Sequence, residues 1–115
     1  MPEWTRYVYG SGAGLLIYGL KGIEMEYALH FNFEAMNNEA EYEALVAGLE
    51  LVRTMGVRRI LVRGDSKLMM DQIRGDYGIK NESLMKYHGK ATTVAKSFAH
   101  IFFEHIPRSE NEEAD

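Results

Sequence analysis

The spacing of the hydrophobic residues changes between residues 30 and 40, and this change constrains the fold more than any other feature. Before it, apolar and polar residues alternate with a period of two, which is typical of a strand with one buried face. One face carries Ile23, Met25, Tyr27 and Leu29, and the other carries Glu24, Glu26, Ala28 and His30. After it, the period is helical: Ala40, Ala44, Gly48, Leu51, Val52 and Met55 recur at steps of three and four. The chain therefore combines strand and helix in one α/β unit.

Glycines and capping residues divide the rest of the chain into short elements. Two β-prone runs at 4–9 and 13–18 are joined to each other and to the next strand by glycine turns, which predicts an antiparallel meander. The first helix begins at Asn37 or Asn38, both good N-caps, and ends at Gly56.

Four further elements follow that helix. A strand is expected over 57–62, a short helix over 67–74 between Ser66 and Gly75, a third helix capped by Asn81, and a last strand over 101–106. The third helix has an apolar stripe made of Leu84, Tyr87, His88, Ala91, Val94, Ala95 and Phe98. The order is β-β-β-α-β-α-α-β, and parallel pairing is expected among the first, fourth and fifth strands. This predicts a mixed five-stranded sheet with helices packed on it.

Composition narrows the classes of function. The chain has 115 residues, and we expect one domain over 1–115. With 13 basic and 17 acidic residues its net charge is −4, so it does not bind polyanions by bulk charge. The absence of cysteine excludes disulfides, thiol catalysis and cysteine-ligated zinc. No apolar run reaches the ~20 residues that a membrane span needs, and no signal peptide is evident. We expect an intracellular monomer, cytoplasmic or nuclear, without a membrane partner.

Three acids stand where elements begin or end. Asp65 directly follows the fourth strand, Glu41 lies in the first turn of the first helix, and Asp115 lies in a tail that reads as the start of a further, truncated helix. Carboxylates at the ends of parallel strands suit Mg²⁺, which takes oxygen ligands. Each also has a structural explanation: Asp65 as a turn residue, Glu41 as a partner of the helix dipole, Asp115 as a solvated tail. His105 is equally explained as a packed or solvated residue.

The sequence segments around these acids resemble the motifs of a known family. Residues 33–45, Phe-Glu-Ala-Met-Asn-Asn-Glu-Ala-Glu-Tyr-Glu-Ala-Leu, resemble the Asn-Asn-x-x-Glu helix start of the type I ribonuclease H family. Residues 62–66 resemble its Asp-Ser motif at a strand end, and residues 105–115 resemble its His…Asn-x-x-x-Asp segment. The most similar members are the ribonuclease H domains of gypsy-type retrotransposon polyproteins and their domesticated relatives in plants. The resemblance covers nearly the whole chain, in order.

The resemblance implies the ribonuclease H-like fold and cleavage of the RNA strand of RNA–DNA hybrids with two Mg²⁺ ions, or Mn²⁺. By motif position it implies three metal ligands, Glu41, Asp65 and Asp115. His105 matches a histidine that assists water movement or product release. The implied contacts with nucleic acid are made by Asn37, Asn38, Ser66, Lys67 and Asn111. A reverse transcriptase or other neighbours in a polyprotein are the implied partners.

One departure bears on activity. The family's first acid ends the first strand, but Tyr9 stands at that position and the following loop is several residues shorter. A neutral tyrosine cannot replace a bridging carboxylate. We therefore expect impaired cleavage. The alternative is an inactive ribonuclease H-fold module that binds nucleic acid or serves a structural role in a retroelement polyprotein.

Two further alternatives depend on local composition. The glycine-rich run 10–14 follows a strand as a phosphate-binding loop would, but it lacks the Gly-Lys-Ser/Thr ending and favours a hairpin turn. A local basic edge is conceivable from Arg53, Arg58, Arg59 and Arg63, although a solvated surface explains the same residues.

Overall fold

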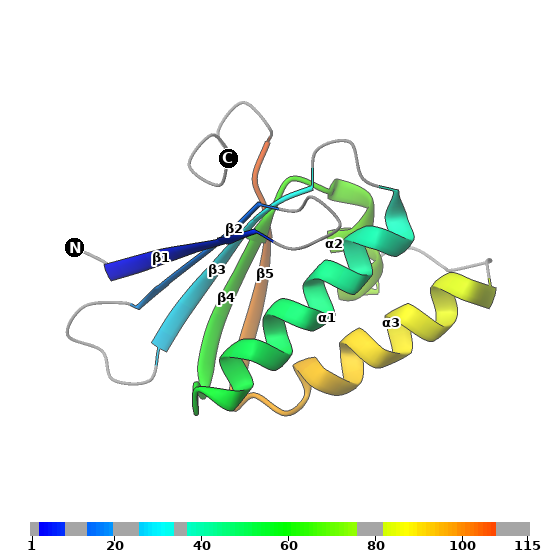
Figure 1. Ribbon diagram of the computed structural model, residues 1–115. Helices are drawn as coiled ribbons and strands as arrows, with labels where there is room; N and C mark the ends of the chain where they lie inside the picture. Colours follow the sequence, from blue (N-terminus) through cyan, green and yellow to red (C-terminus); the bar gives the residue numbers. More distant parts are fainter. Residues whose placement is uncertain (1–2, 9–13, 20–25, 34–36, 76–81, 108–115) are drawn as a thin grey trace.

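The computed structural model describes residues 3–8, 14–19, 26–33, 37–75 and 82–107, with the side chains of 3–8 and 18 left aside. Its elements confirm the predicted order. The strands are β1 (Glu3–Val8), β2 (Gly14–Gly19), β3 (Glu26–Asn32), β4 (Arg59–Gly64) and β5 (His100–His105), and the helices are α1 (Asn38–Thr54), α2 (Lys67–Arg74) and α3 (Glu82–Ala95). Within the described residues these strands form one mixed sheet, and α1 and α3 cover one of its faces (Figure 1).

The order of the strands corrects one prediction. The sheet order is β1-β2-β3-β4-β5, so β1 lies at the far edge and β3 pairs in parallel with β4, Leu29 opposite Val62 and Phe31 opposite Gly64. β5 pairs in parallel with β4 as predicted. Parallel pairing of the first strand with the fourth was therefore wrong. The physical reason is that the antiparallel pairs keep β1, β2 and β3 in chain order, and α1 then crosses from β3 to the adjacent β4.

The ends of the helices follow the capping residues. The Asn37 side chain accepts a hydrogen bond from the Ala40 amide at 2.8 Å and caps α1. Ser66 caps α2 in the same way, accepting from the Met69 amide at 3.2 Å, and Gly75 ends α2 with φ of 86°. These caps confirm the predicted helix boundaries. The expected cap of the third helix, Asn81, lies outside the described residues.

The fourth strand begins later than predicted because Met55, Gly56 and Val57 form the turn that closes α1. Gly56 has φ of 81°, and the amide of Val57 donates to the carbonyl of Val52 at 3.3 Å. These residues close the helix and leave the strand to begin at Arg59 instead of residue 57. The fifth strand is likewise displaced by one residue from its predicted range.

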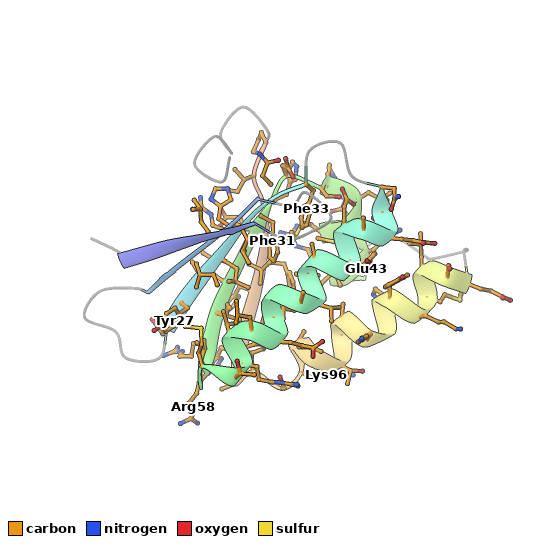
Figure 2. All side chains as sticks on the ribbon, in the orientation of Figure 1. Tyr27, Phe31, Phe33, Glu43, Arg58 and Lys96 are labelled. Atoms are coloured by element: carbon orange, nitrogen blue, oxygen red, sulfur yellow. The ribbon has the colours of Figure 1, made fainter. Side chains whose placement is uncertain are left out.

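The core lies between the sheet and α1, where Phe31 and Phe33 stack with their centroids 5.1 Å apart (Figure 2). The first helix buries one face, made of Tyr42, Ala44, Leu45, Val46, Gly48, Leu49 and Val52. The opposite face of β3 is also buried, because Ala28, His30 and Asn32 are at most 4% exposed. The prediction of a strand with one solvated face is therefore wrong for residues 28–32, which run through the middle of the sheet with a strand on either side.

Two glycine substitutions should separate close packing from helix propensity. A Cβ on Gly48 would lie 2.8 Å from the Cζ of Phe31, a fully buried ring held by its stack, so Gly48→Ala should destabilise the fold by about 1–3 kcal/mol. Gly89 in α3 has no atom within 4 Å of such a Cβ, and Gly89→Ala should stabilise by up to about 1 kcal/mol. Urea denaturation of both variants measures this. Equal effects would contradict the packing of α1 on β3.

Candidate metal and nucleic-acid site

Asp65 lies where two parallel strands end. It follows β4 directly, and its Oδ1 accepts a hydrogen bond from the backbone amide of Phe33, just beyond β3, at 2.8 Å. The bond joins the carboxyl ends of neighbouring strands, the edge at which open α/β sheets place their sites. Asp65 therefore has a structural contact as well as a position suited to a ligand.

Glu41 reaches the same edge from the first turn of α1. Its Oε1 accepts a hydrogen bond from the Oγ of Ser66 at 2.9 Å, and Ser66 directly follows Asp65. The hydroxyl of Ser66 also caps α2. One serine thus links the start of α1 to the start of α2, and it brings two of the predicted ligands to neighbouring positions in space.

His105 ends β5 at this edge, because the parallel register places it opposite Gly64, the residue before Asp65. The next amide, that of Ile106, donates to the carbonyl of Gly64 at 2.8 Å. The predicted residues Asn111 and Asp115 lie outside the described residues. In the part of the chain that the structure describes, no three His, Asp or Glu side chains are grouped closely enough to hold a metal ion.

The donor chemistry of this edge fits a divalent cation. Mg²⁺ is often held by only one or two carboxylates, with water and substrate phosphate completing its shell. Glu41 and Asp65 supply two carboxylates, each with one oxygen held by a hydrogen-bond donor. Such bonds orient a ligand before the metal binds.

The predicted nucleic-acid residues lie around the starts of α1 and α2. Asn37 is the exposed cap of α1, and the Nδ2 of Asn38 donates to the Oε1 of Gln72 at 3.2 Å. Lys67, in the first turn of α2, is paired with Asp71 at 2.7 Å although its side chain is 69% exposed. Together with Ser66, these residues border the two acids.

Sequence reasoning missed Tyr42 and Gln72. The Oη of Tyr42 donates to the Oε1 of Gln72 at 2.9 Å, and both side chains are buried, at 0% and 6% exposure. Burial, and then the charge of neighbouring Glu41, raise the pKa of Tyr42 to about 12. The sequence feature that could have indicated this contact is Gln72 itself, a polar residue on the buried side of the short helix α2.

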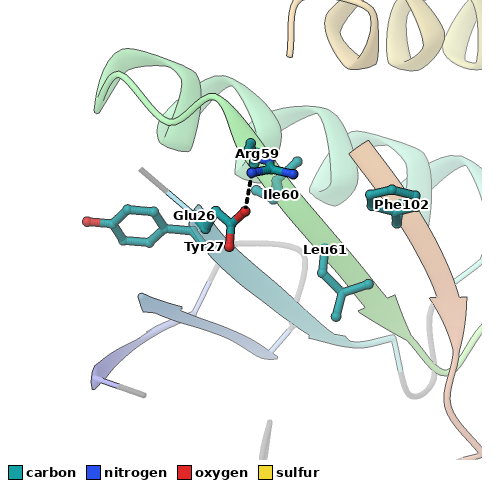
Figure 3. Close-up of a pocket in the computed structure, with 6 residues that line it drawn as sticks. All are labelled: Glu26, Tyr27, Arg59, Ile60, Leu61 and Phe102. Atoms are coloured by element: carbon teal, nitrogen blue, oxygen red, sulfur yellow. Dashed lines mark ion pairs between the residues drawn. The ribbon is translucent and has the colours of Figure 1, made fainter. Parts of the chain in front are cut away.

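The arginines that suggested a basic edge are partly neutralised. Arg59 pairs with Glu26 at 2.9 Å, and Arg63 pairs with Glu104 at 3.5 Å. The first of these pairs borders a cavity lined by Glu26, Tyr27, Arg59, Ile60, Leu61 and Phe102 (Figure 3). This cavity adjoins the first residues of β3 and β4, at the opposite end of the strands from Asp65, and it is not part of the site.

None of the described helices is both long and apolar enough to cross a membrane.

Comparison with known proteins gives a consistent result. The sequence model of the reverse transcriptase-like family matches residues 9–115. Ribonuclease HI of Halobacterium salinarum is 37% identical over 81 residues, which are 70% of this chain and 41% of that protein. A bifunctional protein of Mycobacterium tuberculosis is 38% identical over 81 residues, 22% of its length. The chain thus spans less than half the length of these curated relatives.

Solved structures agree in fold. Ribonuclease H1 of H. salinarum superposes with a TM-score of 0.70 at 27% identity, covering 97% of this chain and 88% of that one. The N-terminal ribonuclease H domain of the M. tuberculosis protein has a TM-score of 0.67 at 29% identity, covering 99% and 86%. LC11 ribonuclease H1, solved with an RNA/DNA hybrid, has a TM-score of 0.63 at 28% identity, covering 97% and 88%.

Tyr42 should make the stability of this protein fall at alkaline pH. Its pKa is about 12 when folded against 10.0 as reference, so the folded state holds the proton more tightly. This contribution is complete below pH 10 and is lost as the pH approaches 12, at about 1.4 kcal/mol per pH unit. Urea denaturation should therefore show that the difference in the free energy of unfolding between the wild type and Tyr42→Phe shrinks across this pH range. A constant difference would contradict the raised pKa of Tyr42.

Proposed function

The chain belongs to the reverse transcriptase-like family and has the ribonuclease H-like fold, and from this premise we propose that it acts on RNA–DNA hybrids and hydrolyses their RNA strand. The observation that carries the proposal is the pair of acids at the carboxyl edge of the sheet, Glu41 and Asp65, linked through Ser66. The hybrid bound to LC11 ribonuclease H1 supports the class of substrate.

The two carboxylates would hold a divalent cation, Mg²⁺ or Mn²⁺, with Asp115 as a third ligand. When bound, the metal supplies positive charge that activates water and stabilises the reacting phosphate. The residues of the chain prepare its place: the Phe33 amide holds one oxygen of Asp65, and the Ser66 hydroxyl holds one oxygen of Glu41. His105, at the same edge, would assist the movement of water or the release of product.

Recognition of the hybrid would come from the polar residues around this edge. We assign it to Asn37, Asn38, Ser66, Lys67 and Asn111. Amide and hydroxyl groups suit this task because RNA differs from DNA by its 2′-hydroxyl, which can both donate and accept a hydrogen bond. Since the net charge is −4, the bound metal and this local set would have to offset the repulsion between chain and phosphates.

The rate of cleavage would be low because Tyr9 stands where the family has its first acid. The same feature favours a second candidate function, an inactive module that binds hybrids or serves a structural role in a retroelement polyprotein beside a reverse transcriptase. An intracellular location and a single-domain organisation over 1–115 belong to the same proposal.

The proposed site is tested with Asp65→Asn and Glu41→Gln. Each should lower Mg²⁺-dependent cleavage of a labelled RNA–DNA duplex by on the order of 100-fold, because each removes charge that stabilises the transition state. Glu39→Gln is the matched control: it makes the same change in the same helical turn, at an exposed side chain. Mg²⁺ titration followed by NMR should show one weak site that both active-site variants abolish.

The outcomes separate the candidates. Cleavage that survives Asp65→Asn would overturn the assignment of the site. Hybrid binding without cleavage by the wild type would favour the inactive module, and no binding at low salt would exclude every version that requires a hybrid.

A further inference from the structure

Gln72 lies in α2, and its side-chain oxygen accepts hydrogen bonds from two residues of α1, Asn38 and Tyr42. We infer that Gln72 is a positioning residue, which holds the side-chain amide of Asn38 in the orientation that recognises the hybrid. The inference rests on the proposed function, since it assigns a supporting residue to the same site.

The acceptor of this link is saturated. An amide oxygen has two lone pairs, and the Oε1 of Gln72 receives Nδ2 of Asn38 at 3.2 Å and Oη of Tyr42 at 2.9 Å. The hydroxyl of Tyr42 is the donor in its bond. The oxygen therefore faces two donors, and Asn38 must present its NH₂ group to it.

Gln72 is itself held in place by its surroundings. Its backbone carbonyl lies 3.0 Å from Nε2 of His88 in α3 and accepts from the amide of Gly75 at 3.1 Å. The ring of His88 packs edge-on against that of Tyr42, with centroids 6.3 Å apart. Three helices thus meet at this residue, which is only 6% exposed.

The fixed orientation of the Asn38 amide also determines the surroundings of its oxygen, Oδ1. With Nδ2 committed to Gln72, the Oδ1 of Asn38 is a buried acceptor that has no hydrogen-bond partner among the described residues. A buried acceptor left unpaired is destabilising, and such groups call for a specific explanation. A donor from the hybrid, of which the 2′-hydroxyl of RNA is the chemical candidate, would satisfy it.

The link through Gln72 is separate from the link that holds the acids. Glu41 lies one turn after Asn38 and is tied to Ser66, so the first turn of α1 is joined to the cap of α2 through Ser66 and to the second half of α2 through Gln72. Loss of the Gln72 acceptor should release Asn38 and leave Glu41 in position. Hybrid affinity and the chemical step should therefore respond differently.

The experiment compares Gln72→Met, which keeps the length of the side chain but has no such acceptor, with Gln72→Glu, which keeps one. Gln72→Met should weaken hybrid binding about tenfold, the worth of one hydrogen bond of about 1.4 kcal/mol, and should raise KM with little change in kcat. Gln72→Glu should recover most of the affinity. Gln72→Leu is the second acceptor-free variant if the methionine variant does not fold.

Two controls distinguish positioning from general destabilisation. Tyr42→Phe removes the other donor to the same oxygen but leaves the bond to Asn38, so it should lower stability and retain affinity. In an Asn38→Ala background, Gln72→Met should cause no further loss, because the residue through which it acts is gone. Wild-type affinity in Gln72→Met, or a full additional loss in that background, would overturn the inference.

A separate readout keeps this inference distinct from the proposed function. Hydrogen exchange of the Asn38 side-chain NH₂, followed by NMR without nucleic acid, should accelerate in Gln72→Met and remain slow in Gln72→Glu. If the wild type binds no hybrid, the proposed function is overturned, and hydrogen exchange of the Asn38 NH₂ group alone then tests whether Gln72 holds this amide. Unchanged exchange in Gln72→Met would then overturn the link as well.

Discussion

The parallel pairing of β3 with β4 is the contact on which the rest of the molecule depends. Parallel neighbours need a crossover, and α1 supplies it directly. As a result the carboxyl ends of both strands reach one edge, and Phe33 meets Asp65 there. The start of α1 follows a few residues after β3, so Glu41 and Asn38 arrive at the same edge. A site between distant segments is therefore a consequence of topology.

Structure and site share their polar groups at this edge. Ser66 caps α2 and holds Glu41, Asn37 caps α1 within the motif of the family, and Asp65 joins two strands. The capping roles of Asn37 and Ser66 are confirmed, and they do not compete with a functional role. A carboxylate that is already held in place has less freedom to lose when a cation binds.

Features that depend on residues close together in the sequence were predicted more reliably than features that depend on distant residues. The two N-caps act within three residues; Ser66 was predicted as one, and Asn37 was one of the two candidates for the other. The neighbour of β4 depends on competition between strands separated by several elements, and β1 was expected there in place of β3. Gln72 was missed because its partners, Asn38 and Tyr42, lie about 30 positions away.

The order of the elements, the helix ends and the motifs that place the chain in its family can be read from the sequence, since each depends on neighbouring residues or on a fixed spacing. Three features emerge only in the folded molecule: the strand that borders β4, the pairing of Arg59 and Arg63 with acids, and the glutamine oxygen that joins α1 to α2. These are contacts between residues far apart in the chain, and their partners are selected by burial and packing of the whole sheet and helix layer, which no local pattern encodes.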